Sequence, residues 1–207
     1  SSTSRGLGDV YKRQQYTPEK GWDENKLDMF RRHIIQLGTT GVFVIYDELE
    51  GKEAVTWSYL LHTVELPMEI QELTDEVKVI GKNKAGGVSV AHLFSSAKTE
   101  QAMVDTFFCA PTNWKNVTNA QGKTLKYPNH WHFTATSEKA QVYRFATVIN
   151  THALKYPAKD PEILSDGRIK VGGWLISVNL KSDGAPSFFI RSTQEKVNIC
   201  LLYTSPS

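Results

Sequence analysis

Short runs of β-branched and aromatic residues, separated by polar turns, dominate the hydrophobic pattern near the start of the chain. Three such runs occupy residues 30–37, 42–47 and 55–62, and each is rich in valine, isoleucine, phenylalanine or tyrosine. These residue types favour extended backbone over helix. The pattern therefore predicts three successive strands, with turns at 38–41 (Gly-Thr-Thr-Gly) and at the charged segment 48–53.

The same pattern continues along the rest of the chain. Further strands are expected at 68–73, 76–80, 88–94, 102–109, 168–180 and 187–192, and a hairpin is expected from 131–135 and 142–149. No segment keeps an apolar period of 3.6 residues long enough to predict a helix. Many short strands with turn signals between them are typical of an all-β, antiparallel β-sandwich.

Composition narrows the function classes. The chain has 207 residues, of which 40% are hydrophobic and 22% charged, and its net charge is +2. These values are ordinary for a globular protein, and the small net charge gives no sign of a nucleic-acid partner. No window approaches the ~20 apolar residues of a membrane span, so no membrane partner is expected. Two cysteines do not make a disulfide framework.

Polar side chains interrupt the first three apolar runs. His33 lies among isoleucines, Asp47 ends the second run and His62 ends the third. A tight hairpin centred near residue 40 places His33 almost opposite Asp47, whereas regular pairing leaves His62 far from Asp47 unless a bulge or a long turn intervenes. Two imidazoles and a carboxylate are a three-ligand set for zinc, with a fourth position for water. The alternative is three unrelated polar residues near strand ends.

Several segments resemble the central β-domain of the heparinase II/III-like polysaccharide lyases. They are RRHIIQL, FVIYDELEG and WSYLLH near the start, and YPNHWHFTAT with YRFATVI further on. The resemblance covers roughly residues 20–150. It implies a supersandwich-like β-domain that follows an α-helical toroid, with a structural zinc held by two histidines and an aspartate. On the matching segments the ligands are Asp47, His62 and His33.

The resemblance also implies a function. Such enzymes cleave acidic, uronate-containing polysaccharides by β-elimination in the bacterial periplasm or outside the cell, and most catalytic groups lie in the toroid, which this chain lacks. We therefore expect the chain alone to be inactive. A non-catalytic carbohydrate-binding or interaction module is the alternative, as is a family member that has lost the chemistry.

Candidate substrate-binding residues are Arg31, Arg32 and Trp114. Adjacent arginines offer forked donors for a uronate carboxylate, although paired arginines beside acidic turns more often form surface salt bridges. A loop tryptophan such as Trp114 offers a stacking platform for sugar, as does Trp22, whereas Trp57 and Trp174 look like core residues. His130 and His132 share a strand face, which suits either two ligands of one metal or a solvated polar face.

The two ends of the chain do not resemble folded protein. Residues 1–14 and 200–207 resemble translated sequencing adapter, so both are expected to be non-native tails and the sandwich is expected to be truncated at both ends. Between them we expect a β-sandwich domain at 15–150. Residues 151–199 are expected to supply a linker and closing strands, either of the same domain or of a small second β-module.

Overall fold

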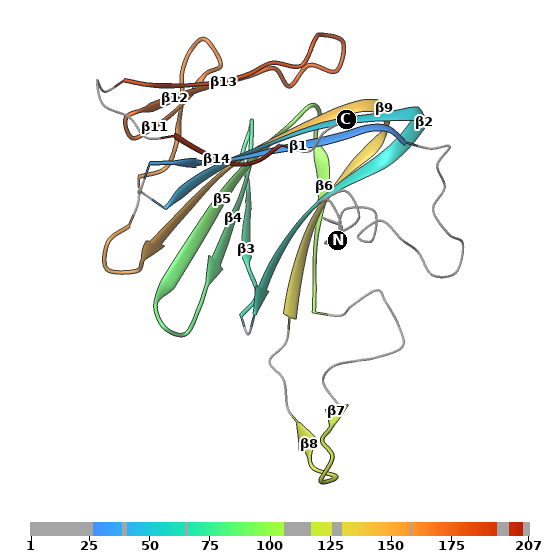
Figure 1. The fold of residues 1–207 in the computed structure, drawn as a ribbon, viewed down its shortest axis with the longest axis vertical. Helices are drawn as coiled ribbons and strands as arrows, with labels where there is room; N and C mark the ends of the chain where they lie inside the picture. Colours follow the sequence, from blue (N-terminus) through green and yellow to red (C-terminus); the bar gives the residue numbers. More distant parts are fainter. Residues whose placement is uncertain are drawn as a thin grey trace, which may run out of the picture.

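The computed structural model describes residues 27–38, 41–64, 66–105, 117–125, 130–157, 159–193 and 199–204. All the regular structure in these residues is β-strand, and every strand pair is antiparallel. The predicted all-β, antiparallel class is therefore confirmed (Figure 1). The part of the chain that the structure describes holds no helix long and apolar enough to cross a membrane.

One eight-stranded sheet forms most of the molecule. Its order is β14-β1-β2-β9-β5-β4-β3, and β6 also pairs with β9. The bounds are β1 Leu27–Leu37, β2 Val42–Val64, β3 Glu69–Glu72, β4 Val77–Lys82, β5 Gly87–Ser95, β6 Thr99–Val104, β9 His130–Ala153 and β14 Ile199–Thr204. β14 includes residues of the expected C-terminal tail, and its backbone pairs with β1 at the edge of the sheet. A two-stranded ribbon, β7 Val117–Thr118 with β8 Thr124–Leu125, stands apart.

The two longest strands, β2 and β9, pair along almost their whole length and bend together. Their register breaks between Glu50 and Val55, where β9 passes through Val142 and Ala140. Two predictions are wrong here, because 48–53 and 136–141 are not turns between separate strands. Most of the polar side chains of these segments are at least partly exposed on the outside of a shared bend, so the sequence pattern matches that of a turn.

The bend folds the sheet over a first apolar core. The rings of Tyr59 and Phe145 lie 5.5 Å apart, although Tyr59 pairs with Ala135 and Phe145 pairs with Asp47 along the ladder. The distal halves of β2 and β9, with β6, therefore close over the central strands (Figure 1). The core comprises Leu49, Trp57, Tyr59, Met68, Val79, Ala91, Leu93, Phe133, Ala135, Tyr143 and Phe145.

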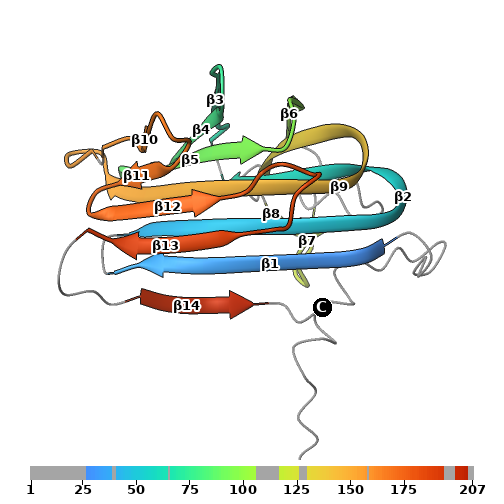
Figure 2. The same ribbon diagram turned by 90° about the horizontal axis from the view of Figure 1, so that it is seen from above.

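A four-stranded sheet packs on the opposite face of the large sheet (Figure 2). Its strands are β10 Glu162–Ile163, β11 Ile169–Val171, β12 Trp174–Val178 and β13 Phe188–Ser192. The apolar cluster between the sheets comprises Ile35, Leu37, Val44, Tyr46, Phe94, Ala146, Val148, Ile169, Val171 and Ile176. Buried Arg144 donates to the carbonyls of Asn179, Lys181 and Gly184, which fixes the β12–β13 loop on the large sheet.

Most remaining strands match their predicted positions, with one more correction. The run 168–180 is a hairpin of β11 and β12 and not one strand, because it turns at Gly172, whose φ is 55°. That left-handed conformation suits a residue without a side chain. β6 covers Thr99–Val104, and residues 106–109 of the expected 102–109 strand lie outside the described residues.

Candidate functional site

Asp47 is buried in a two-pronged ion pair with Arg32. The two residues are cross-strand partners, and the Nε and Nη2 of Arg32 donate to the two carboxylate oxygens of Asp47 at 2.6 and 2.7 Å. The Asp47 side chain is 2% exposed and that of Arg32 is 33% exposed. Burial raises the pKa of Asp47 above its usual range, and the hydrogen bond and charge of Arg32 oppose that rise.

His33 lies on the other face of the sheet. The prediction that it sits opposite Asp47 is wrong by one residue, because its partner in the ladder is Tyr46. A slip of one residue moves a side chain to the opposite face. The Nε2 of His33 lies 2.9 Å from a carboxylate oxygen of Glu48, and its ring contacts those of Tyr46 and Phe188.

His62 lies in a third place, on the distal half of β2. It pairs with His132 of β9, and their ring centroids are 4.4 Å apart. The neighbouring pair Leu61 and Phe133 faces the first core, so the two histidines lie on the opposite face of these strands, where His62 is exposed and His132 is buried. Asp47, His62 and His33 therefore do not fit one zinc ion as they lie. Within the described residues, no three histidine, cysteine or acidic side chains converge for a metal.

The predicted substrate-binding residues are placed as follows. The guanidinium fork of Arg32 is turned toward Asp47, and its carbon lies 5.5 Å from the ring centroid of Tyr59. The Nη1 of Arg31 lies 3.5 Å from Glu48. Both arginines thus have acidic partners within the protein, although the carboxylate that Arg32 pairs with is buried and not on the surface. Trp114 lies outside the described residues, and so does Trp22.

The two tryptophans predicted to be core residues are both partly or fully buried. Trp57 is 7% exposed and belongs to the first core, where its ring nitrogen donates to the carbonyl of Ala140. Trp174 packs against the second core. The Trp57 side chain is therefore not placed to stack on a sugar.

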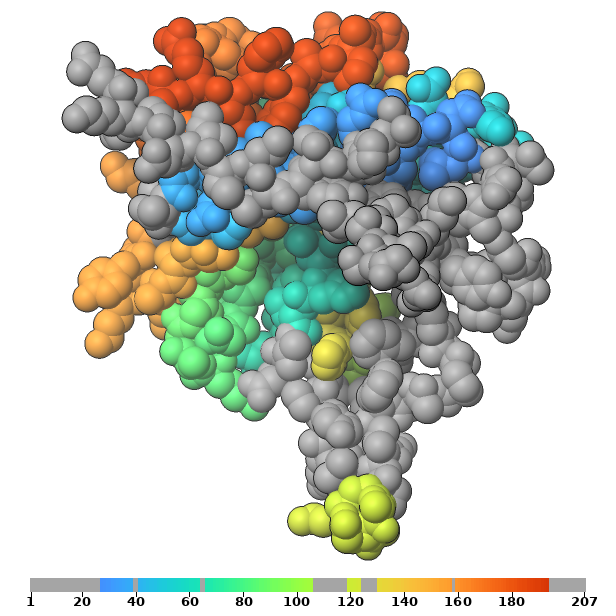
Figure 3. Space-filling model, in the orientation of Figure 1, coloured from blue at the N-terminus to red at the C-terminus, as the bar shows by residue number. Residues whose placement is uncertain are grey.

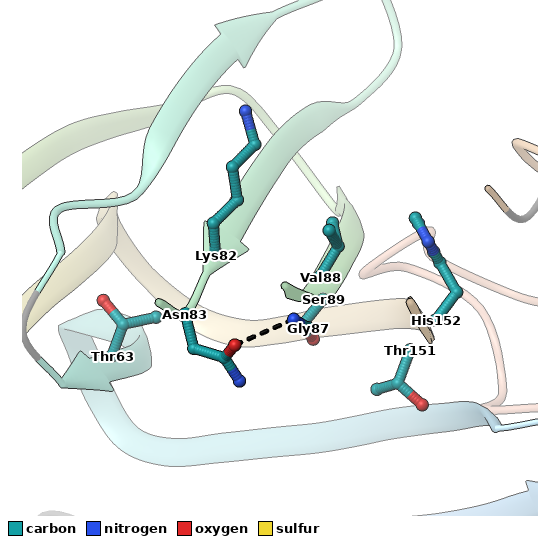
Figure 4. Close-up of a pocket in the computed structure, with 9 residues that line it drawn as sticks. Thr63, Lys82, Asn83, Gly87, Val88, Ser89, Thr151 and His152 are labelled. Carbon is teal, nitrogen blue, oxygen red and sulfur yellow. Dashed lines mark hydrogen bonds between the residues drawn. The ribbon is translucent and has the colours of Figure 1, made fainter. Parts of the chain in front are cut away.

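A pocket of about 560 Å³ lies beside the β4–β5 hairpin (Figure 4). Its lining comes from the end of β2, the β4–β5 hairpin and the end of β9, and consists of Thr63, Gly81, Lys82, Asn83, Gly87, Val88, Ser89, Thr151 and His152. Thr63 and Asn83 lie on one side and Thr151 and His152 on the other, while Lys82 extends outward. Several of these side chains carry hydroxyl, amide or cationic groups.

The shape of the pocket depends on small residues. A Cβ at Gly81 would lie 2.8 Å from the Cγ2 of Thr63, so a larger residue would collide with the opposite wall. The Oδ1 of Asn83 accepts a hydrogen bond from the backbone of Gly87 at 2.8 Å, which closes the β4–β5 turn. The Nζ of Lys82 lies 3.9 Å from a carboxylate oxygen of Glu69, and both side chains are half exposed.

Sequence reasoning missed this pocket because its walls come from three distant segments. The one local signal is Asn83-Lys84-Ala85-Gly86-Gly87, a glycine-containing turn between two strands. That signal locates a hairpin and says nothing of Thr63 or His152, which only the fold brings to it.

A second polar cluster surrounds buried His92. Its Nδ1 lies 3.0 Å from Glu76, and its Nε2 lies 3.5 Å from Asp160, which also accepts a hydrogen bond from Lys78 at 2.6 Å. The two carboxylates approach opposite ring nitrogens, so they hold the imidazole and do not form a common ligand set. His92 itself is 1% exposed.

No protein-family model matches the chain, and no curated protein matches it.

Proposed function

We propose that the chain is the β-domain of a polysaccharide lyase that acts on an acidic, uronate-containing glycan by β-elimination. In this proposal the domain binds the glycan, and the catalytic groups lie outside the domain. Three features support it: the resemblance of RRHIIQL, FVIYDELEG and WSYLLH to that family, the all-β architecture, and the pocket beside the β4–β5 hairpin.

The lining of this pocket is the observation that carries the proposal. It combines an ammonium group, an imidazole, an amide and three hydroxyls, and it includes no carboxylate. Hydroxyl and amide groups exchange hydrogen bonds with the hydroxyls of a sugar. A lysine close to the opening attracts a uronate carboxylate through a charge-assisted hydrogen bond. The chemistry therefore favours an acidic saccharide over a neutral one.

Two buried tyrosines are not available as the base of an elimination. Elimination needs a base that reaches the proton on C5 of the uronate and an acid that reaches the leaving oxygen. Tyr46 and Tyr59 are 0% and 2% exposed, and burial raises the pKa of each to about 12. Neither phenol reaches a bound sugar or ionises near neutral pH, so both serve packing.

The test is binding of a uronate oligosaccharide, measured by calorimetry at low salt. Lys82→Met is expected to weaken binding about tenfold or more, because a hydrogen bond to a charged group contributes ~1.5–3 kcal/mol. Lys98→Met is the matched control, since that lysine is 87% exposed on its side chain and lies outside the pocket. Binding should weaken with added salt.

Two results would overturn the proposal. Equal binding of a neutral oligosaccharide would show that the charge of the glycan does not matter. Equal affinity in Lys82→Met and Lys98→Met would show that the glycan does not bind in the pocket. Elimination is followed separately by the ultraviolet absorbance of the unsaturated product, and none is expected from the chain alone.

A carbohydrate-binding or interaction module without an attached lyase is the second candidate. The observation that favours it is the exposed aromatic Tyr156, which is 76% exposed and follows His152 closely in the chain. Exposed aromatic side chains are common in binding surfaces. Under this candidate, Tyr156→Ala weakens glycan or protein binding while Lys82→Met does not.

A further inference from the structure

A buried histidine connects two strands of the large sheet to the β9–β10 loop, which the structure describes at 154–157 and 159–161. His92 of β5 is 1% exposed, and its Nδ1 lies 3.0 Å from a carboxylate oxygen of Glu76, the residue directly before β4. Its Nε2 lies 3.5 Å from a carboxylate oxygen of Asp160 in the loop. Each ring nitrogen therefore has a carboxylate beside it, one next to a strand and one in the loop.

The charged groups around His92 come from the β4 side and from the loop. The ladder partners of His92 are Lys78 on β4 and Val148 on β9, so its β9 partner carries no charge. The Nζ of Lys78 donates to Asp160 at 2.6 Å. Within the described residues, the charged side chains that meet the ring are Glu76 and Asp160, and Lys78 is the second partner of Asp160.

The two protonation states of this ring make different contacts. A neutral imidazole has one N–H donor and one acceptor nitrogen, whereas an imidazolium donates from both nitrogens. When His92 is neutral, one of the two carboxylates therefore faces a lone pair, and the ring is too buried for solvent to relieve that contact. The Glu76 side chain is 13% exposed and that of Asp160 is 56% exposed, so Asp160 is the partner that can turn toward solvent.

We propose that His92 is a proton-controlled latch on the β9–β10 loop, closed while the imidazolium donates to both carboxylates and loosened when the ring loses its proton to solvent. Histidine is the side chain whose charge ordinarily changes between pH 5 and 8. Lys78 still pairs with Asp160 after that loss, so the loop loosens without detaching. The loop begins next to the β4–β5 turn, where the backbone N–H of Leu154 donates to the carbonyl of Gly86 at 2.8 Å. The latch does not depend on the proposed function.

The test is hydrogen exchange of the whole chain at about pH 5.5 and about pH 8, which lie on either side of the ordinary histidine titration. Each rate is divided by that of an unstructured peptide, so that the intrinsic effect of pH cancels. Asp160 stays ionised at the lower pH, because its hydrogen bond to Lys78 lowers its pKa. Protection of the peptide that covers 154–163 is expected to be about fivefold lower at the higher pH, the effect of losing one partly exposed ion pair.

Three variants show which group is responsible. His92→Gln keeps a donor for one carboxylate and does not titrate, so it should abolish the difference between the two pH values. Asp160→Asn changes an exposed residue and removes the carboxylate in the loop, so it tests the latch even if replacement of the buried histidine unfolds the protein. His152→Gln is the matched control, a partly exposed histidine near the end of β9, and it should keep the wild-type difference.

Equal protection of the loop at the two pH values in wild type overturns the proposal. A wild-type difference that persists in folded His92→Gln or in Asp160→Asn overturns it, as does one that disappears in His152→Gln, because another group would then control the loop. A change of the same size in the peptides of β2 overturns it as well, since the effect would then be on global stability.

Discussion

The pair of Arg32 and Asp47 makes the sharpest test of how this fold is held together. Arg32→Met removes the cation and leaves a carboxylate whose side chain is 2% exposed without its partner. Breaking a buried ion pair from one side costs ~3–5 kcal/mol. Because the Arg32 side chain is 33% exposed, water already screens part of the interaction, and we expect the lower end, about 3 kcal/mol.

The loss is expected in both chemical and thermal unfolding. A change of this size lowers the melting temperature of a domain of 150–250 residues by roughly 6–12 °C. The double variant Arg32→Met, Asp47→Leu is expected to regain most of the stability, because apolar residues replace a buried ion pair at little cost. Asp47 faces the first core, where its ladder partner Phe145 and the nearby Tyr59 are apolar rings.

The pH dependence gives an independent check. Burial already raises the folded-state pKa of Asp47 above 3.8, so this group contributes stability that is present below pH 3.8 and lost as pH rises through the folded pKa. Without Arg32 the folded-state pKa of Asp47 rises further, so the stability that is lost at neutral pH is larger. The stability gap between wild type and Arg32→Met should therefore narrow as the pH is lowered toward 4.

Urea unfolding at pH 7 and at about pH 4.5 measures the free energy of unfolding of wild type, of Arg32→Met and of the double variant. A free energy of unfolding for Arg32→Met within about 1 kcal/mol of wild type at pH 7 would contradict the loss of a buried ion pair, which must cost more. A double variant less stable than Arg32→Met alone would contradict it as well, because the carboxylate would then stabilise the fold without its partner.

Three further predictions test the bend, the pocket and the loop after β9. Trp57→Ala is expected to cost ~3–5 kcal/mol in urea unfolding, since its ring fills the first core at 7% exposure, and a cost below about 1 kcal/mol would contradict that packing. Gly81→Ala is expected to cost ~1–3 kcal/mol through its collision with the Thr63 methyl, and Thr63→Ser should restore the melting temperature if that methyl is the cause. The pKa of Asp160 is lowered, first by its hydrogen bond to Lys78, so its contribution to stability is present above pH 3.8 and lost as pH falls through the lowered pKa. Asp160→Asn should therefore speed proteolysis of the loop after β9 at pH 7. Equal proteolysis rates in Asp160→Asn and wild type would contradict the contact.

The sequence by itself determined the class of fold and the places of most strands. Runs such as 30–37, 68–73, 76–80 and 88–94 are local patterns of β-branched and aromatic residues, and the structure has strands at all four. A side-chain preference for extended backbone acts within a few residues, so it can be read without knowing the partner strand. The burial of Trp57 follows from the same alternation of faces.

Tertiary structure decided how those strands join and which polar groups meet. The charged segment 48–53 is the same in sequence whether the chain turns back or bends with a partner, and only its pairing with β9 makes it a bend. The register of β1 on β2 differs by one residue from the predicted hairpin. As a result Asp47 pairs with Arg32, and His33 lies on the opposite face of the sheet from Asp47. His62 meets His132 for the same reason: cross-strand contacts depend on pairing between residues far apart in the chain, and no local pattern encodes that pairing.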